Sequence, residues 1–233
     1  MTVSSATGEE SGFTLGAIEV AAARLDLPPE EVRALCARVC EAERRRAARF
    51  HFDRDRRRFI VARARLRELL GARLAVDPES VELVYGRNGK PALAPRFADT
   101  GWRFNVSHCG EVAVYAFSRT CEIGIDVEAV HEVREAGHIA ARFFSRRENQ
   151  AYLALAPQDR ALGFFNCWTR KEAFVKALGD GLSLRLDEFD VSLAPGEPAQ
   201  FLRIGGTPGE DSGWRLFSFS PLPGFVAALA SHR

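Results

Sequence analysis

The sequence predicts an α+β fold, and three observations support that class. Apolar residues recur at helical spacing over residues 30–50, 54–74 and 160–178. Residues 102–106 and 112–117 instead form short apolar runs, separated by a polar segment that contains glycine, as expected for strands. With 46% hydrophobic and 27% charged residues over 233 positions, the composition is that of a soluble globular protein of one large or two small domains.

The beginning of the chain is predicted to contain one strand and two helices. Residues 1–12 are small and polar, carry no predicted element, and lack the apolar run of a signal peptide. A strand is expected over 17–27 and ends at a pair of prolines. A helix is expected over 30–50, because acidic residues precede basic ones along it and match the helix dipole. A second helix, over 54–74, presents one apolar stripe.

The middle of the chain is predicted to consist of strands. Residues 81–85 alternate as a strand, and the loop that follows is rich in turn-forming residues. Residues 102–106 and 112–117 are predicted to pair as a hairpin, with residues 107–111 at its tip. A hydroxyl, an imidazole and backbone amides at such a tip can bind a phosphate, or can simply close the turn.

A strand predicted over 121–128 carries the first candidate metal ligands. Alternate residues of a strand share a face, so Gly124, Asp126 and Glu128 are expected to lie together. Two carboxylates side by side repel each other unless a cation lies between them, and oxygen ligands favour Mg²⁺ over a transition metal. The alternative is an exposed strand end that carries two solvated acids.

Three helices and four strands are predicted in the remainder of the chain. Ser145 is expected to cap a helix over 146–155, with Glu148 completing a capping box. The other helices are predicted at 133–144 and 160–178, and the strands at 189–193, 200–204, 214–218 and 225–228.

The helix over 160–178 carries a second group of candidate residues. It is expected to end at Gly179 and Gly181, because glycine tolerates positive φ. Glu172 and Lys176 stand one turn apart on one face of this helix. They could bind one small ligand, or they could form an ordinary i,i+4 ion pair.

Lysine is rare in this chain. Of the 32 lysines and arginines, only Lys90, Lys171 and Lys176 are lysines. Lysine is a compact charge whose pKa can shift, whereas the planar guanidinium of arginine stays charged. We therefore interpret Lys90 and Lys176 as positions where arginine would not serve. Lys171 could be an ordinary solvated residue.

Positive charge is concentrated near the start of the chain. Residues 33–73 contain fourteen arginines and five acidic residues, an excess of nine positive charges, although the formal net charge of the chain is +1. Such a segment should attract a polyanion, although most of its arginines could simply be solvated. The five cysteines are odd in number and form no Cys-x-x-Cys pair, which favours free thiols in a reducing compartment.

Four segments, taken in order, resemble motifs of the Sfp-type 4′-phosphopantetheinyl transferases. They are Phe-Asn-Val-Ser-His at 104–108, Gly-Ile-Asp-Val-Glu at 124–128, Arg-Phe-Phe-Ser at 142–145 and Trp-Thr-Arg-Lys-Glu-Ala-Phe-Val-Lys at 168–176. Gly-Lys-Pro at 89–91 and residues 50–58 extend the similarity over nearly the whole chain past residue 30. Cys109 stands where many members of the family have a second serine.

The resemblance implies an enzyme that transfers 4′-phosphopantetheine from coenzyme A to a serine of an acyl, peptidyl or aryl carrier protein and releases 3′,5′-ADP. It also implies two similar α/β subdomains in a pseudo-twofold arrangement, with coenzyme A bound between them. We expect residues 1–118 to form the basic subdomain that binds the phosphates of coenzyme A. Residues 119–233 would then carry the metal and the catalytic groups.

The resemblance further implies roles for individual residues. Asp126, Glu128 and Glu172 would hold Mg²⁺ on the pyrophosphate, with Asp126 and Glu172 also counted as catalytic. Glu172 would act as the base for the serine hydroxyl, and Lys176 would stabilise or protonate the leaving phosphate. The other ligands of coenzyme A would be Lys90, at the nucleotide or pyrophosphate, and Arg45, Arg58, Ser107 and His108, at the 3′-phosphate.

Two other functions are compatible with the same residues. The arginine-rich segment could belong to a nucleic-acid-binding module, although no known reader motif is present. The acids and the lysine could instead serve a metal-dependent hydrolase of coenzyme A or of nucleotides, with water in place of serine. For the transferase we expect a cytoplasmic monomer whose partners are coenzyme A and carrier proteins, with neither nucleic acid nor membrane.

Overall fold

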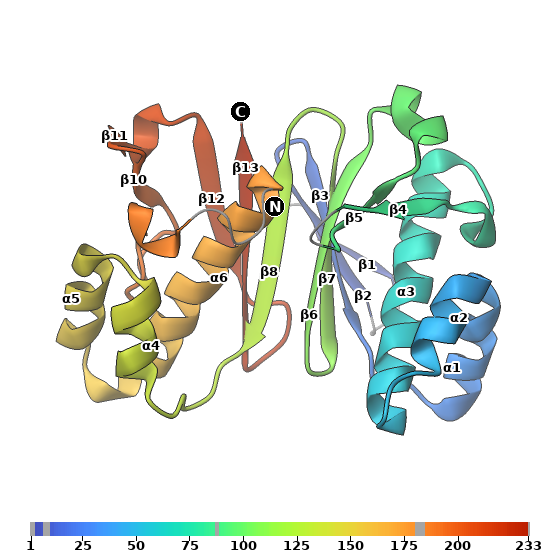
Figure 1. Ribbon diagram of the computed structural model, residues 1–233, viewed down its shortest axis with the longest axis horizontal. Coiled ribbons are helices and arrows are strands. Elements are labelled where there is room, and N and C mark those ends of the chain that lie inside the picture. Colours follow the sequence, from blue (N-terminus) through green and yellow to red (C-terminus); the bar gives the residue numbers. More distant parts are fainter. Residues whose placement is uncertain (1–2, 7–9, 87–88, 180–184, 233) are drawn as a thin grey trace.

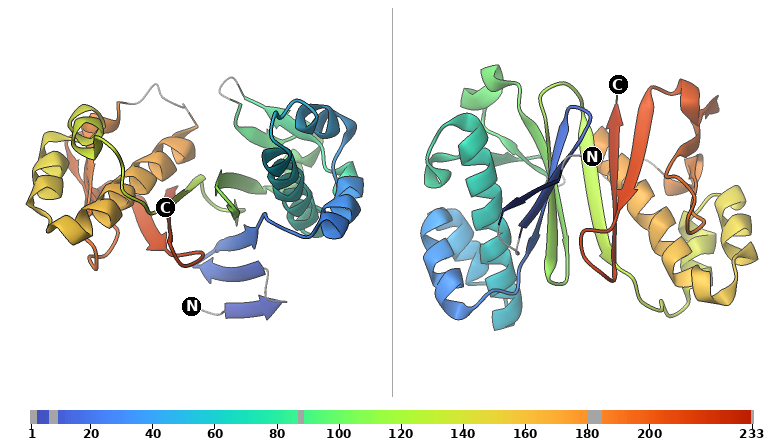
Figure 2. Two further views of the ribbon diagram at one scale, coloured as in Figure 1. Left: turned by 90° about the horizontal axis from the view of Figure 1, so that it is seen from below. Right: turned by 180° about the vertical axis from the view of Figure 1, so that it is seen from behind.

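The computed structural model describes residues 3–6, 10–86, 89–179 and 185–232 of the chain. It consists of two α+β halves whose sheets pack against each other, with the helices on the outer sides (Figure 1). Figure 2 shows the same two halves from below and from behind. The fold class expected from the sequence is therefore confirmed. Gly181, expected to help end the last long helix, lies outside the described residues.

The sheet of the N-terminal half has the strand order β1-β2-β3-β7-β6, and all its neighbouring strands are antiparallel. Its strands are β1 (Val3–Ala6), β2 (Glu10–Leu15), β3 (Ile18–Arg24), β6 (Arg103–Cys109) and β7 (Val112–Ser118). A separate two-stranded hairpin consists of β4 (Leu83–Tyr85) and β5 (Pro91–Leu93).

The absence of a predicted element in residues 1–12 is wrong, because β1 and part of β2 lie there. β2 pairs with β3 in register from Leu15 opposite Ile18, and Gly16 takes a φ of 63° in the turn between these strands. Small polar residues give no alternating hydrophobic pattern. They can still add strands to the edge of a sheet, since pairing needs only backbone hydrogen bonds.

The single helix expected over 30–50 is broken near Val39. It forms α1 (Pro29–Leu35) and α2 (Glu41–Ala47), with a short 3-10 turn after α1. Val39 has an extended backbone and is only 1% exposed, because its side chain belongs to the core of this half. Helical periodicity in the sequence did not reveal this buried break.

The next helix, α3 (Asp53–Leu74), matches its prediction closely. It packs along the N-terminal sheet, where the Tyr115 hydroxyl on β7 donates a hydrogen bond to the Ala62 carbonyl over 3.0 Å. Tyr115 is fully buried. The helix is therefore held above the sheet at the height of a tyrosine side chain.

Strands β6 and β7 form the predicted hairpin, but its tip is shorter than expected. The ladder continues to Cys109 opposite Val112, so only Gly110 and Glu111 form the turn. Ser107 and His108 therefore lie within β6, and their placement at the tip is wrong. The prediction ended the strand with its apolar run, but the pairing of β6 with β7 extends three residues further, to Cys109.

The C-terminal half contains a sheet in the order β12-β13-β8, covered by the last long helix. Its elements are β8 (Ile123–Ala129), α4 (Ala136–Phe143), α5 (Arg146–Ala154), α6 (Arg160–Leu178), β9 (Phe189–Val191), β10 (Phe201–Ile204), β11 (Thr207–Pro208), β12 (Trp214–Phe219) and β13 (Phe225–His232). Ser145 caps α5 as predicted, because its Oγ accepts a hydrogen bond from the Glu148 N–H over 3.2 Å. Strand β11 has no counterpart among the predicted elements.

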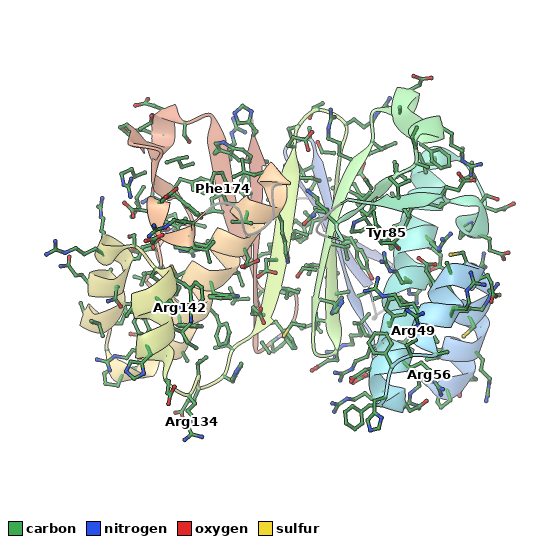
Figure 3. The ribbon with its side chains drawn as sticks, in the orientation of Figure 1. Arg49, Arg56, Tyr85, Arg134, Arg142 and Phe174 are labelled. Carbon is green, nitrogen blue, oxygen red and sulfur yellow. The ribbon has the colours of Figure 1, made fainter. Side chains whose placement is uncertain are left out.

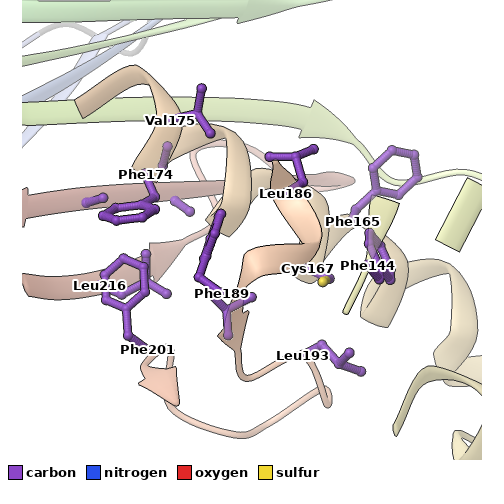
Figure 4. Packing of buried hydrophobic residues seen from close by; sticks show 14 of the residues in the cluster. Phe144, Phe165, Cys167, Phe174, Val175, Leu186, Phe189, Leu193, Phe201 and Leu216 are labelled. Atoms are coloured by element: carbon purple, nitrogen blue, oxygen red, sulfur yellow. The ribbon is translucent and has the colours of Figure 1, made fainter. Parts of the chain in front are cut away.

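Three hydrophobic clusters hold together the part of the chain that the structure describes. One lies between α3 and the N-terminal sheet, and a second between α6 and the C-terminal elements. In the second, the ring of Phe174 contacts those of Phe189 and Phe201 with centroid distances of 4.8 and 4.9 Å (Figure 4). The third cluster lies between the two sheets and contains Ile125 and Val127 of β8, as the predicted alternation required.

None of the helices in the described ranges combines the length and the apolar composition needed to cross a membrane. The five cysteines, all within those ranges, are free thiols.

Candidate active site

The site begins where the edge strands of the two halves meet. β6 is the last strand of one sheet and β8 the last strand of the other. Asn105 on β6 is buried, and its side-chain oxygen accepts a hydrogen bond from the Ile125 N–H on β8 over 2.8 Å. This bond holds the two edge strands at a fixed offset, so that Ser107 on β6 reaches Asp126 on β8.

Ser107, Asp126 and Lys176 form one hydrogen-bonded cluster. The Ser107 hydroxyl donates to Asp126 Oδ1 over 2.8 Å, and Lys176 Nζ lies 2.5 Å from the same oxygen and 3.0 Å from Ser107 Oγ. Asp126 is only 4% exposed, and a buried carboxylate requires such partners. Lys176 thus pairs with Asp126 rather than with Glu172, so the alternative of an ordinary i,i+4 ion pair is wrong.

Helix α6 reaches this cluster because β8 carries a glycine beneath it. A Cβ atom added to Gly124 would lie 2.1 Å from the Ala173 carbonyl oxygen and 2.3 Å from the Ala177 nitrogen. Any larger residue would therefore push the helix away. Because Glu172 and Lys176 each precede one of those two alanines, the close contact holds both beside the face of β8 that carries Asp126.

The carboxylates of this region repel one another. Burial raises the pKa of Glu172, and the charge of Asp126 raises it further. Burial also raises the pKa of Glu128, which shares a hydrogen bond with the Cys109 thiol. Burial raises the pKa of that thiol to about 11, so Cys109 is a neutral group at pH 7.

These oxygens have the chemistry of a site for a hard divalent cation. Oδ2 of Asp126 is buried and has no hydrogen-bond partner, and Glu128 and Glu172 supply further oxygens with raised pKa values. Within the described part of the chain, however, no three histidine, cysteine or acidic side chains already converge on one point. A cation would therefore have to draw Glu128 and Glu172 toward Asp126.

Lys90 joins the same region from the N-terminal half. Its ammonium group donates a hydrogen bond to the backbone carbonyl of Lys176. Burial lowers the pKa of Lys90, and the nearby charge of Lys176 lowers it further. The two lysines that the sequence singled out thus meet at the electronegative C-terminal end of α6.

His108 lies at the rim of a neighbouring cavity of about 210 Å³, which Phe50, Arg58 and Phe59 also line. Desolvation of its ring lowers the pKa of His108, and three nearby cations lower it further. They are Lys176, Arg63 and Arg46. His108 is therefore within electrostatic reach of the lysine cluster and of a second, arginine-containing group.

The two arginines predicted at the 3′-phosphate already have carboxylate partners. Arg58 donates two hydrogen bonds to Asp26, over 2.7 and 2.6 Å, while its side chain lines the cavity. Arg45 is 70% exposed and lies 3.4 Å from Glu41. Arg58 is therefore near His108, whereas Arg45 lies in the adjoining open groove beside Phe50.

Sequence reasoning missed the two arginines whose charges lower the pKa of His108. Arg46 and Arg63 lie on α2 and α3, and both guanidinium groups pack over the ring of Phe59, at 5.3 and 5.7 Å from its centroid. The sequence did contain a signal, because Arg63 follows Phe59 by one helical turn. That signal was lost among the many other arginines of the segment.

Lys171 is fully buried, so its interpretation as a solvated residue is wrong. Its ammonium group lies 2.8 Å from Glu148 Oε2, and it donates to the carbonyls of Leu186 and Phe189. Glu148 in turn accepts a hydrogen bond from the Val191 N–H. This buried pair joins α5, α6 and β9.

The fold and the site together define a class of protein: an enzyme of two α+β halves, with acids and lysines at their boundary beside a basic pocket, suited to a substrate with several phosphates. Comparison with known proteins identifies the class more closely. Residues 122–230 match the 4′-phosphopantetheinyl transferase superfamily, and residues 28–120 match the N-terminal region of 4′-phosphopantetheinyl transferases. The chain belongs to the 4′-phosphopantetheinyl transferase family.

Individual relatives agree with this assignment. The 4′-phosphopantetheinyl transferase HetI of Nostoc is 38% identical over 206 residues, which cover 88% of this chain and 84% of the relative. The 4′-phosphopantetheinyl transferase Sfp of Bacillus subtilis is 31% identical, and the match covers 72% of each chain. The human L-aminoadipate-semialdehyde dehydrogenase-phosphopantetheinyl transferase is 29% identical over 66% of this chain and 52% of its own.

Proposed function

We propose that this 4′-phosphopantetheinyl transferase carries out its reaction at the cluster of Ser107, Asp126 and Lys176, with Glu172 beside it. The reaction moves the 4′-phosphopantetheine group of coenzyme A to a serine of a carrier protein and releases 3′,5′-ADP. The observation that supports this site best is the meeting of Asp126 and Lys176, over 2.5 Å, where the two halves of the molecule join. Residues 1–118 and 119–233 are our proposed subdomains.

Asp126, Glu128 and Glu172 are the proposed ligands of Mg²⁺. The unpartnered Oδ2 of Asp126 supports this assignment, and so do the raised pKa values of Glu128 and Glu172, which reflect burial and the charge of the neighbouring carboxylates. When bound, the cation would neutralise charge on the pyrophosphate. Asp126→Asn should weaken binding of Mn²⁺ to the protein without coenzyme A, as measured by calorimetry. Unchanged Mn²⁺ affinity would contradict the assignment.

Glu172 and Lys176 are the proposed catalytic pair. A carboxylate with a raised pKa is a stronger base than an ordinary glutamate, so Glu172 is suited to accept the proton of the carrier serine. The serine oxygen then attacks the β-phosphorus, and the bond from that phosphorus to the oxygen that joins it to 3′,5′-ADP breaks. Lys176 would leave Asp126 to stabilise or protonate that oxygen.

The remaining ligands belong to the nucleotide end of coenzyme A. His108 and Arg58, on the wall of one cavity, support a site for the 3′-phosphate, and Arg45 lies in the groove next to it. Ser107, predicted at the 3′-phosphate, instead contacts Asp126 and Lys176, so we propose that it orients that pair. Lys90 is proposed to meet the pyrophosphate, since it lies at the backbone of Lys176.

Partners and location follow from this activity. We propose acyl, peptidyl or aryl carrier proteins as acceptors, and a cytoplasmic monomer as the working form. A nucleic-acid partner is disfavoured, because many arginines of residues 33–73 are paired with acids of the same chain. Pairs are formed by Arg44 with Glu41, Arg56 and Arg57 with Asp53, Arg67 with Glu43 and Arg73 with Glu19.

Mass spectrometry of a panel of apo carrier proteins tests the proposal. After incubation with coenzyme A and Mg²⁺, a carrier should gain the mass of phosphopantetheine, whereas the same carrier with its acceptor serine replaced by alanine should not. Release of 3′,5′-ADP at full rate without any carrier would contradict the proposal, and would favour a hydrolase that uses water as acceptor.

A further inference from the structure

Arg63 is held in place by two aromatic rings in the N-terminal half. Its Nη2 donates a hydrogen bond to the Tyr85 hydroxyl over 3.0 Å. Its guanidinium lies 5.6 Å from the centre of the Tyr85 ring and 5.7 Å from that of Phe59. Tyr85 stands beside α3 in Figure 3, and the residue is 47% exposed. Such stacking fixes a planar cation in one orientation.

The charge of Arg63 is balanced only in part, because the carboxylate that it pairs with also pairs with Arg67. Arg63 forms an ion pair with Glu43, whose Oε1 lies 3.8 Å from Arg63 Nε and has no hydrogen-bond partner. The other oxygen of Glu43 is 2.6 Å from Arg67. Arg46, across the Phe59 ring, forms no ion pair with any described residue. Arg63 and Arg67 thus share one carboxylate and Arg46 has none in the described part of the chain, which leaves two positive charges for an anionic ligand.

The position of this group matches one part of the substrate. The charges of Arg46 and Arg63 contribute to the lowered pKa of His108. Phe59, over which both guanidinium groups pack, lines the 210 Å³ cavity together with His108. The catalytic cluster of Ser107, Asp126 and Lys176 begins one residue earlier on β6. Coenzyme A carries a pyrophosphate and, on its ribose, a separate 3′-phosphate. With the pyrophosphate at the catalytic cluster, the 3′-phosphate is the anion left for the arginines.

We propose that Arg63 is a specificity-determining residue that binds the 3′-phosphate of coenzyme A together with Arg46 and His108, and that Tyr85 positions it. This inference rests on the proposed function. It assigns the recognition of the 3′-phosphate to a pre-oriented guanidinium that is short of carboxylate, instead of to Arg45, which is exposed and paired with Glu41. Planar guanidinium groups form two parallel hydrogen bonds to phosphate, which a lysine cannot reproduce.

Calorimetric titration of the full chain with two nucleotides tests the proposal. One is 3′,5′-ADP, and the other is adenosine 5′-diphosphate (ADP), which lacks the 3′-phosphate. Arg63→Met should raise the Kd of 3′,5′-ADP by roughly 10- to 100-fold, the loss expected for a charge-assisted hydrogen bond. The Kd of ADP should change by less than about two-fold, because no phosphate of ADP would meet Arg63. Tyr85→Phe should raise the Kd of 3′,5′-ADP alone, by less than Arg63→Met does, because it removes only the hydroxyl that orients Arg63.

Arg57→Met is the matched control, since it removes the same charge from the same helix. Arg57 is partly exposed and pairs with Asp53 over 3.1 Å, so its loss should leave both Kd values within about two-fold. Arg63→Lys, which keeps the charge, provides a second variant if Arg63→Met fails to fold. It should still lose much of the preference for 3′,5′-ADP, because lysine lacks the planar fork.

The outcomes are decisive for Arg63. An unchanged Kd of 3′,5′-ADP in folded Arg63→Met, an equal loss for both nucleotides, or an equal loss in Arg57→Met would each overturn the assignment. Failure of the wild-type chain to modify any apo carrier, with selective binding of 3′,5′-ADP intact, would instead refute the proposed function and leave the phosphate site standing.

The titration of His108 gives an independent readout. The nearby charge of Arg63 contributes to its lowered pKa, so Arg63→Met should raise the pKa of His108 toward its ordinary value. Lys176, Arg46 and desolvation would still act on the ring, so the pKa should stay lowered in part. An NMR titration of the imidazole measures this, and an unchanged pKa would show that Arg63 does not face His108.

Discussion

The two long helices differ in how closely they approach their sheets. Helix α6 comes so close to β8 that a single methyl group at Gly124 would collide with its backbone. Helix α3 is separated from β7 by the fully buried ring of Tyr115, whose hydroxyl reaches the Ala62 carbonyl. The helix is therefore in direct backbone contact with the sheet in one half, whereas a wider gap separates helix from sheet in the other.

This difference fits the division of work that we propose between the halves. On the α6 side, the short gap brings Asp126 and Glu172 close enough for the charge of Asp126 to raise the pKa of Glu172, as the proposed metal and proton chemistry requires. On the α3 side, apolar side chains fill the gap, and the groups that we propose to bind the nucleotide are long arginine side chains. Close packing suits chemistry at one atom, whereas long side chains suit the binding of an extended nucleotide.

The largest effect is expected from Glu172→Gln, which removes the helix carboxylate from the close contact. Transfer to carrier should fall by about 10² to 10⁴ in kcat, the range typical of a lost general base, with thermal stability preserved. The matched control is Glu68→Gln on α3, where the carboxylate pairs with Arg65 over 3.0 Å and is not part of the proposed site. Near-normal turnover in Glu172→Gln would remove its assigned role.

Gly124→Ala should be the next most damaging change. The new methyl group would meet backbone atoms that cannot give way, so we expect a loss of about 1–3 kcal/mol of stability or more, as for overpacked cores. Displacement of α6 should also lower kcat. Chemical denaturation and carrier assays measure both. Gly137→Ala is the control, because open space surrounds Gly137 and the change should be neutral or slightly stabilising. Equal behaviour of the two variants would mean that the close contact is unimportant.

Asn105→Ala tests the bond between the two edge strands. It leaves the Ile125 N–H without its partner, which should cost about 1–3 kcal/mol of unfolding free energy. Because the offset between β6 and β8 is then less well fixed, kcat should fall more than KM for coenzyme A rises. Asn105→Asp keeps an oxygen acceptor and should recover part of the loss. No difference between these two variants would argue against the bond.

The smallest effect is expected from Tyr115→Phe on the wide side. It keeps the ring that separates α3 from β7 and removes one buried hydrogen bond, for a loss of about 0.5–1.5 kcal/mol. Steady-state rates with coenzyme A and carrier should stay normal, because the spacing of the helix does not change. A fall in kcat comparable with that of Gly124→Ala would show that the two halves do not differ in this respect.

Much of the site could be anticipated because its residues lie in short segments with clear periodicity. The alternation of β8 predicted which face carries Asp126 and Glu128, and the turn from Glu172 to Lys176 predicted one face of α6. The 3′-phosphate end was predicted less well. Arg45, Arg46, Arg58 and Arg63 look alike in a run of fourteen arginines, and only their partners distinguish them.

The sequence by itself determined the α+β class, the long helices, the family, and the residue types of the proposed catalytic cluster, because these depend on local periodicity and on motifs within single segments. Only the tertiary structure decided which groups meet. It paired Lys176 with Asp126, buried Lys171 against Glu148, and left Arg46 and Arg63 short of carboxylate. Ion pairs between distant segments depend on the packing of whole elements, so their charges can be counted in a sequence but their partners cannot.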